Sequence, residues 1–111
     1  MKTTAAIVTA ILALALAGAA TAGTPSGYRN ATHHQKHQMN RAVDRAPSSF
    51  QLNKRFAWLI QKSNDRYGVV CGHHHGVSGD YLKHRHGHGW KVLTNSGAVQ
   101  LAFSVCKKAH H

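Results

Sequence analysis

The N-terminal segment constrains the fold most, because it predicts how much of the chain is left to fold. Residues 5–20 form an almost unbroken apolar run rich in Ala and Leu, and Lys2 precedes it. Residues 20–22 (Ala-Thr-Ala) match the small-x-small pattern that signal peptidase cleaves, which predicts a signal peptide over 1–22. A retained membrane anchor is the alternative, but an anchor needs about 20 apolar residues, usually bulkier ones. Removing 22 of the 111 residues leaves 89, enough for one domain. We therefore expect a secreted protein, extracellular or periplasmic, with no transmembrane anchor after cleavage.

The two cysteines of the chain predict a covalent link within that domain. Cys71 and Cys106 are 35 residues apart, and pairing is the default for two thiols in an exported protein. On the chain-entropy model such a link stabilises the fold by about 3–4 kcal/mol. A catalytic thiol is the alternative, because a histidine lies two residues from Cys71.

The charge of the chain is strongly unbalanced. Without Lys2, 13 Lys and Arg side chains stand against three acidic ones, a net charge of about +10 before histidines are counted. All 11 histidines follow residue 22, so protonation in mildly acidic surroundings would raise the charge towards about +21. Such a charge predicts a polyanionic partner, which is nucleic acid, anionic lipid or a cell-wall polymer. The alternative is that the charge only keeps a secreted protein soluble.

Composition divides the mature chain into an arm and a domain. Residues 23–46 are polar, contain three histidines and have few apolar side chains to bury, which predicts a flexible basic arm. A polar helix over 32–45 is an alternative, and it would place His33 and His37 on one face. Asn30 begins a glycosylation sequon, which matters only in a eukaryotic source.

Residues 47–111 are predicted to form the disulfide-stapled domain, and an amphipathic helix is expected at its start. Residues 48–51 (Ser-Ser-Phe-Gln) match a capping box, and Gly68 suits the end of the helix. The expected apolar stripe at helical spacing consists of Leu52, Phe56, Leu59, Ile60 and Ser63.

Beyond this helix the apolar residues alternate, which predicts strands. Residues 67–71 form one expected strand, and residues 90–94 and 98–106 form a hairpin around 95–97. Residues 81–84 could add a fourth. The predicted fold is a small α+β domain, with one N-terminal amphipathic helix packed on an antiparallel sheet of three to four strands.

The segment 72–89 combines histidines with five glycines and is expected to be a mobile loop or ribbon. Alternate side chains of an extended chain lie on one face about 6.5–7 Å apart, which lets two imidazoles share a metal ion. Imidazole ligands suit zinc or copper, and loose metal binding, a defined site and a merely solvated tract all stay open. The candidate metal ligands are His73, His75, His84, His86 and His88.

A second candidate site lies on the expected helix, where Trp58 falls beside Arg55 and Lys62. An indole flanked by cations is typical of a stacking surface for single-stranded nucleic acid. The alternative is that Trp58 packs beneath the arm or a loop. Arg85 and Lys91 complete the predicted polyanion-binding set.

The absence of clustered acids excludes several enzyme classes. Asp44, Asp65 and Asp80 are the only acidic residues, so paired-carboxylate glycosidase and two-metal nuclease chemistry are not expected. Metal-free phosphodiester cleavage remains open, because it needs only a histidine pair and a cation such as Arg85 or Lys91.

These patterns predict a secreted cationic histidine-rich protein that binds anionic polymers or surfaces and a transition metal, in an antimicrobial, bacteriocin-like or metal-sequestering role. The first alternative is a small secreted metal-independent ribonuclease or toxin that uses a histidine pair. The second is a secreted inhibitor or interaction module that presents the glycine-rich segment.

Overall fold

The computed structural model describes residues 24–46 and 51–110. The predicted signal peptide lies outside the described residues and stays a prediction. Within the described ranges, neither helix has the length and apolar character needed to cross a membrane.

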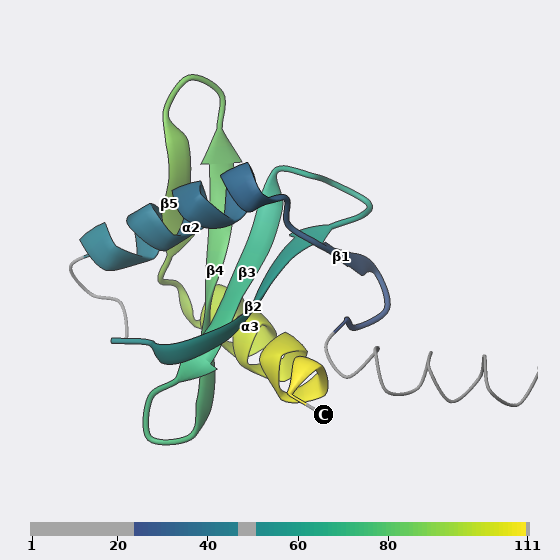
Figure 1. Cartoon of the computed structure of the whole chain (residues 1–111), viewed down its shortest axis with the longest axis vertical. Helices are drawn as coiled ribbons and strands as arrows, with labels where there is room; N and C mark the ends of the chain where they lie inside the picture. Colours follow the sequence, from purple (N-terminus) through teal and green to yellow (C-terminus); the bar gives the residue numbers. More distant parts are fainter. Residues whose placement is uncertain (1–23, 47–50, 111) are drawn as a thin grey trace, which may run out of the picture.

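The described chain forms one antiparallel sheet with a helix on each face (Figure 1). The strands lie side by side in the order in which they occur along the chain. The elements are β1 (Tyr28–Asn30), α2 (His33–Arg45), β2 (Asn53–Gln61), β3 (Tyr67–His73), β4 (Val77–Arg85), β5 (Gly89–Leu93) and α3 (Ser96–Ala109). The α+β class, the antiparallel sheet and the disulfide are confirmed, but the described part has five strands and two helices.

The helix expected at the start of the 47–111 domain is wrong over its described part, because residues 53–61 form β2. Most of the expected capping box at 48–51 lies outside the described residues. Ala57 and Leu59 of this strand face α3, whereas Trp58 and Ile60 face α2. A strand that is covered on both faces is apolar at consecutive positions, and a short run of this kind cannot be told from a buried helix by its period.

The flexible arm predicted over 23–46 is also wrong, because this range contains β1 and α2. The alternative helix over 32–45 is confirmed. Thr32 accepts a hydrogen bond from the Gln35 amide, and the Gln35 side chain accepts one from the Thr32 amide. Met39 and Val43 are buried against the sheet, so two well-placed apolar residues suffice to dock a polar helix.

The strand predicted over 98–106 is wrong as well, because this range belongs to α3. The Asn95 side chain accepts a hydrogen bond from the Ala98 amide and so begins a helix rather than a hairpin turn. The alternating residues Leu101 and Phe103, which suggested a strand, are each 42% exposed. The buried positions follow a helical period and are mostly small, namely Ala98, Ala102, Val105, Cys106 and Ala109.

The strands predicted at 67–71, 81–84 and 90–94 are confirmed within β3, β4 and β5. The mobile loop expected over 72–89 is wrong, since this range is extended except for turns at 74–76 and 86–88. Gly76 and Gly87 adopt positive φ at these turns, which lets both connections stay short.

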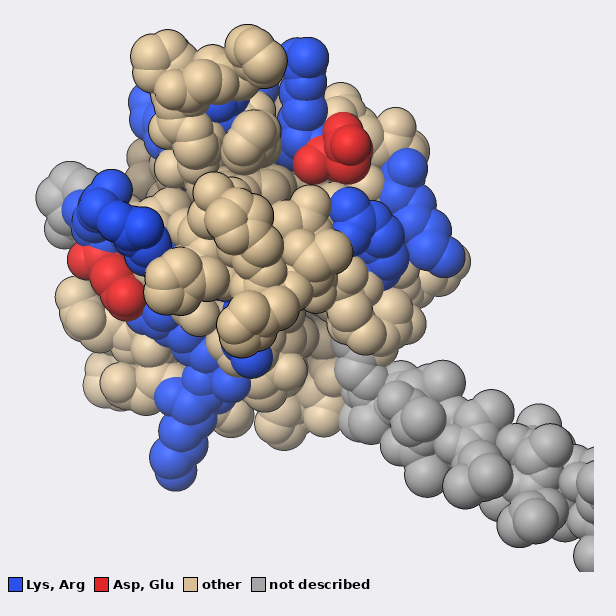
Figure 2. Space-filling view, turned by 45° about the horizontal axis from the view of Figure 1, so that its top comes forward, with Lys and Arg blue, Asp and Glu red and all other residues tan. Residues whose placement is uncertain are grey.

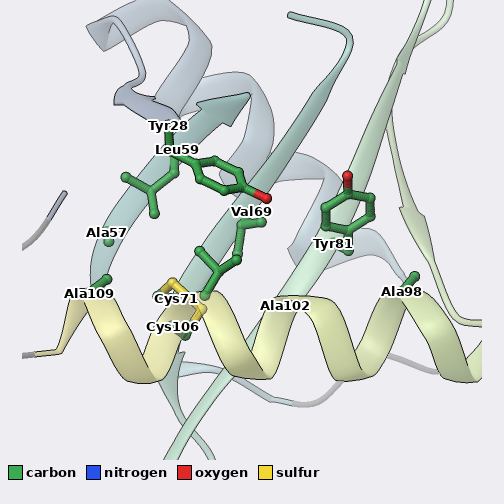
Figure 3. Packing of buried hydrophobic residues seen from close by; sticks show 11 residues of the cluster. Tyr28, Ala57, Leu59, Val69, Cys71, Tyr81, Ala98, Ala102, Cys106 and Ala109 are labelled. Carbon is green, nitrogen blue, oxygen red and sulfur yellow. A yellow bond between two sulfur atoms is a disulfide. The ribbon is translucent and has the colours of Figure 1, made fainter. Parts of the chain in front are cut away.

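The α3 face of the sheet is closed by small side chains and by the disulfide (Figure 3). Cys71 of β3 and Cys106 of α3 are bonded, with their Cα atoms 5.4 Å apart. A Cβ atom at Gly79 of β4 would overlap the sulfur of Cys106, so the helix approaches the sheet closely there. On the opposite face, a Cβ atom at Gly68 would come within 2.8 Å of Met39 Cε, which marks the closest approach of α2.

Candidate functional site: a cationic groove between α2 and β5

The histidines proposed as metal ligands are divided between two ends of the sheet. His73 lies at the turn between β3 and β4, whereas His84 lies near the turn between β4 and β5, which also carries His86 and His88. The nine residues of β4 separate the two turns by roughly 26 Å at about 3.3 Å per residue (Figure 1). The five predicted ligands therefore do not converge on one ion.

Within the described ranges, no group of three or more His, Cys, Asp or Glu side chains is arranged to hold a metal. The imidazoles instead form local ring contacts. His73 contacts His110, His74 contacts His75, and His84 contacts Trp90 edge to face with ring centres 5.0 Å apart.

Trp58 is not an open stacking surface. Its Nε1 atom donates to Asn40 Oδ1 at 2.9 Å, and the Lys36 ammonium lies over its ring, 4.0 Å from the centre. Arg55 donates to Asn40 and is ion-paired with Asp44 on α2. The alternative interpretation, in which Trp58 packs under the N-terminal region, fits these contacts, whereas Lys62 is exposed at the end of β2.

A groove with a volume of about 520 Å³ lies between α2 and β5. Arg41 and Arg45 of α2 line one side of the groove and β5 lines the other, with His88 at the adjoining turn. The remaining lining residues are Gln38, Ala42, Ala46, Gly89, Trp90, Lys91, Val92 and Thr94. The Lys91 side chain alternates with those of Trp90 and Val92 along β5, so it lies on the α3 face of the sheet beside its cross-strand partner Lys83. Two arginines and one imidazole therefore line this hollow.

The spacing on α2 explains why the cations face this groove. Arg41 and Arg45 are four residues apart and therefore lie on one side of the helix. Met39 and Val43, also four apart, anchor a neighbouring stripe to the sheet. Arg45 also lies in the last turn, where a cation is favoured by the helix dipole.

Trp90 gives the groove an aromatic wall. This half-buried side chain comes from β5, packs against the apolar cluster under α2 and contacts the ring of His84. Its Nε1 atom is buried and has no hydrogen-bond partner among the described residues. The groove therefore has an aromatic wall next to cationic side chains, and the Nε1 atom of this indole is not exposed to a ligand.

No acidic side chain lines the groove. Asp44 is bound to Arg55, and Asp65 lies in the exposed turn between β2 and β3. Asp80 is buried beneath α2 with 5% exposure, and this burial raises its pKa to about 6, against the lowering effect of the Arg55 charge. On the face drawn in Figure 2, the Lys and Arg side chains lie in separate places with uncharged surface between them. The groove is thus lined by two arginines and by no acidic side chain.

Of the predicted polyanion-binding residues, only Lys91 is in the lining of this groove, and its side chain lies on the α3 face of the sheet. Arg85 is exposed beside the turn at 86–88. Arg55 of β2 donates a hydrogen bond to Asn40 and so links β2 to α2. Arg41 and Arg45 were missed because the arm was expected to be flexible, and Trp90 was missed because the groove beside its strand forms only when α2 is present. The sequence signal was present: Gln38, Arg41, Ala42 and Arg45 recur at helical spacing beside the Met39–Val43 stripe.

A second, smaller hollow of about 300 Å³ lies between α3 and the turn at 74–76. It is lined by His74, His75, Val77, Ser78, Gly79, Val99, Gln100 and Phe103. This hollow is mainly apolar and has no Lys or Arg in its lining, so it is not a second polyanion groove.

Comparisons with known proteins yield no relative for this chain. No protein-family model, no curated protein and no solved structure matches it. The function therefore has to be argued from the groove itself.

Proposed function

We propose that this protein is a secreted cationic factor that binds an anionic polymer in the groove between α2 and β5. The observation that carries the proposal is that Arg41 and Arg45 line one hollow that has no acidic residue in its lining. Cations gathered in a groove attract successive phosphates of a chain more strongly than the same charges scattered over a surface.

Trp90 favours single-stranded nucleic acid over other polyanions. Exposed bases stack on aromatic side chains, and this adds about 1–3 kcal/mol per base to the attraction of the phosphates. A sulfated polysaccharide or an anionic lipid head group has no aromatic ring to place against the indole. We therefore choose a phosphodiester single strand as the occupant, and the other polyanions become outcomes of the test.

The test is a binding titration of fluorescent single-stranded RNA with the purified, oxidised chain. The variant Arg41→Gln/Arg45→Gln removes the two groove arginines. The matched control Lys107→Gln/Lys108→Gln removes the same charge in the last turn of α3, on the other face of the sheet. We expect the groove variant to bind about 10- to 100-fold more weakly and the control to lose much less.

Two competitors then identify the occupant. A sulfated polysaccharide could displace RNA from the wild type and bind the Trp90→Leu variant with the same affinity as the wild type. This result would show that the groove is a general polyanion site. Vesicles of anionic lipid that bind with the same groove dependence as RNA would indicate a membrane surface instead. Equal losses in the groove variant and the control would contradict the proposal.

Ribonuclease action is a second candidate, and His88 is the observation that favours it. This imidazole lies in the lining of the same groove as the two arginines, and His84 lies against Trp90 on the adjoining strands. Two imidazoles and a cation suffice for metal-free cleavage at a 2′-hydroxyl. Gel analysis of the RNA after incubation with EDTA tests this candidate, since cleavage must be lost in His84→Ala and His88→Ala. Intact RNA at micromolar protein excludes it and leaves binding as the function.

A further inference from the structure

The structure brings together two histidines that lie far apart in the sequence, at the end of the sheet opposite the groove. The ring centres of His73 on β3 and His110 at the C-terminal cap of α3 are 5.5 Å apart. Phe56 of β2 completes the group, with its ring centre 5.5 Å from that of His73 and 5.3 Å from that of His110. We propose that His73 and His110 form a two-imidazole site for a divalent transition-metal ion of the zinc class.

The disulfide explains why these two imidazoles meet. His73 follows Cys71 by two residues in a strand, so both side chains lie on the α3 face of the sheet. His110 follows Cys106 by four residues at the end of a helix, so both lie on its sheet-facing side. The cysteines hold these two elements together covalently, and each histidine lies one step further along the same pair of faces. The imidazoles are therefore positioned before any metal arrives.

The separation of the rings suits a shared ion. A zinc–nitrogen bond is about 2.0–2.1 Å, and the centre of an imidazole ring lies roughly 1.1 Å beyond its nitrogen. Two imidazoles on one zinc ion at near-tetrahedral angles therefore have ring centres about 5–6 Å apart. The observed 5.5 Å lies in this range, with the two ring planes inclined by 78°.

One side of the histidine pair is covered by protein, and the pair is also accessible to solvent. Phe56 is partly buried against the apolar cluster under α3 and covers one side of both imidazoles. His110 is exposed, so solvent can fill the remaining ligand positions of the ion. The C-terminal end of α3 also favours a bound cation through its dipole.

Nearby lysines repel a bound metal ion electrostatically but do not occupy the proposed site. Lys107 and Lys108 lie in the last turn of α3, and Lys54 lies next to Asn53, the residue that pairs with His73. The Lys107 ammonium lies 4.6 Å from the centre of the Phe103 ring, one turn back along the helix. Their charge lowers the affinity, and we therefore expect micromolar rather than nanomolar zinc binding.

The experiment is calorimetric titration of the oxidised chain with zinc chloride in a non-chelating buffer. The variant His73→Gln/His110→Gln removes the proposed ligands. Its matched control is His34→Gln/His86→Gln, which removes two exposed histidines that lie on different elements, α2 and the turn at 86–88. We expect the first variant to lose affinity by about tenfold or more, because a chelating pair becomes isolated ligands, and the control to bind like the wild type.

Three further measurements keep the proposal falsifiable. The melting temperature without zinc and the absence of free thiols verify that each variant retains its fold and its disulfide. Zinc at saturating concentration should raise the melting temperature of the wild type and the control, and EDTA should reverse the rise. Three results would overturn the proposal: no zinc binding by the wild type, unchanged binding by the His73/His110 variant, or a loss of binding confined to the His34/His86 control. The proposed zinc site does not depend on the proposed RNA-binding groove. RNA binding by the wild type in the absence of zinc does not change the result of the zinc titration.

Discussion

The two helices cover opposite faces of one sheet, but they are attached to it in different ways. α3 is attached through small residues and a covalent bond: Ala98 and Ala102 let the backbones approach, and Cys106 is bonded to Cys71. α2 is attached through two buried apolar side chains, Met39 and Val43.

Polar contacts complete the attachment of α2. Asn40 accepts hydrogen bonds from Arg55 and Trp58 of β2, each at 2.9 Å, and Asp44 pairs with Arg55. The difference between the two faces indicates where a small domain can accommodate a binding surface. The closely packed α3 face provides stability, whereas the lightly anchored α2 leaves a groove beside β5.

Removal of the disulfide should have the largest effect on this contrast. In Cys71→Ala/Cys106→Ala, the 35-residue separation is no longer closed, and the free energy of unfolding should fall by about 3–4 kcal/mol. Urea unfolding followed by tryptophan fluorescence measures the loss. A loss below about 1 kcal/mol would show that α3 is held by packing alone and would weaken the contrast between the faces.

Met39→Ala tests the attachment of α2 and should have the next largest effect. Met39 is fully buried against Gly68, so truncation should cost about 3 kcal/mol and weaken RNA binding by displacing the groove cations. The control Leu101→Ala truncates a 42% exposed residue of α3 and should cost about 0.5 kcal/mol or less. If the two variants had equal stability, Met39 would not be the anchor of α2.

Asp80→Asn should have the smallest effect and the opposite sign. Burial raises the pKa of this carboxyl from 3.8 to about 6, so the folded chain binds the proton more readily than the unfolded chain. Stability is therefore lost as the pH rises from about 4 to 6, and the amide removes this loss. We expect the variant to be more stable by about 2 kcal/mol at pH 7 and unchanged at pH 3.5. Chemical unfolding at both pH values measures this, with exposed Asp65→Asn as the control; a destabilised variant at pH 7 would contradict the assigned cause.

Part of the fold could be predicted from the sequence because some signals are local. The cysteine pair, the strands at 67–71 and 90–94 and the antiparallel α+β class follow from residue types and alternation. β2 and α3 were assigned to the opposite classes of structure, since their patterns depend on what covers them. The apolar run at 56–60 is a strand because helices cover both faces, and alanines at 98 and 102 count as core only once α3 is in place.

The candidate site was the least predictable feature for the same reason. The groove depends on α2 docking beside β5, which brings Arg41 and Arg45 to β5 across about 50 residues of sequence. The proximity of His110 to His73 depends on α3 being a helix that reaches Ala109, whereas the predicted strand ended at Cys106. The spacing within 72–89 instead predicted a metal site made of histidines that β4 separates.

The salt dependence of RNA binding tests the central claim most directly. For a single strand, the slope of log affinity against log salt is about −0.7 per phosphate contacted. Arg41→Gln/Arg45→Gln should therefore have a slope that is shallower by about 1.4, whereas Lys107→Gln/Lys108→Gln should keep the slope of the wild type. The same reduction in both variants would mean that RNA is attracted by the overall charge and that the groove between α2 and β5 is not the binding site.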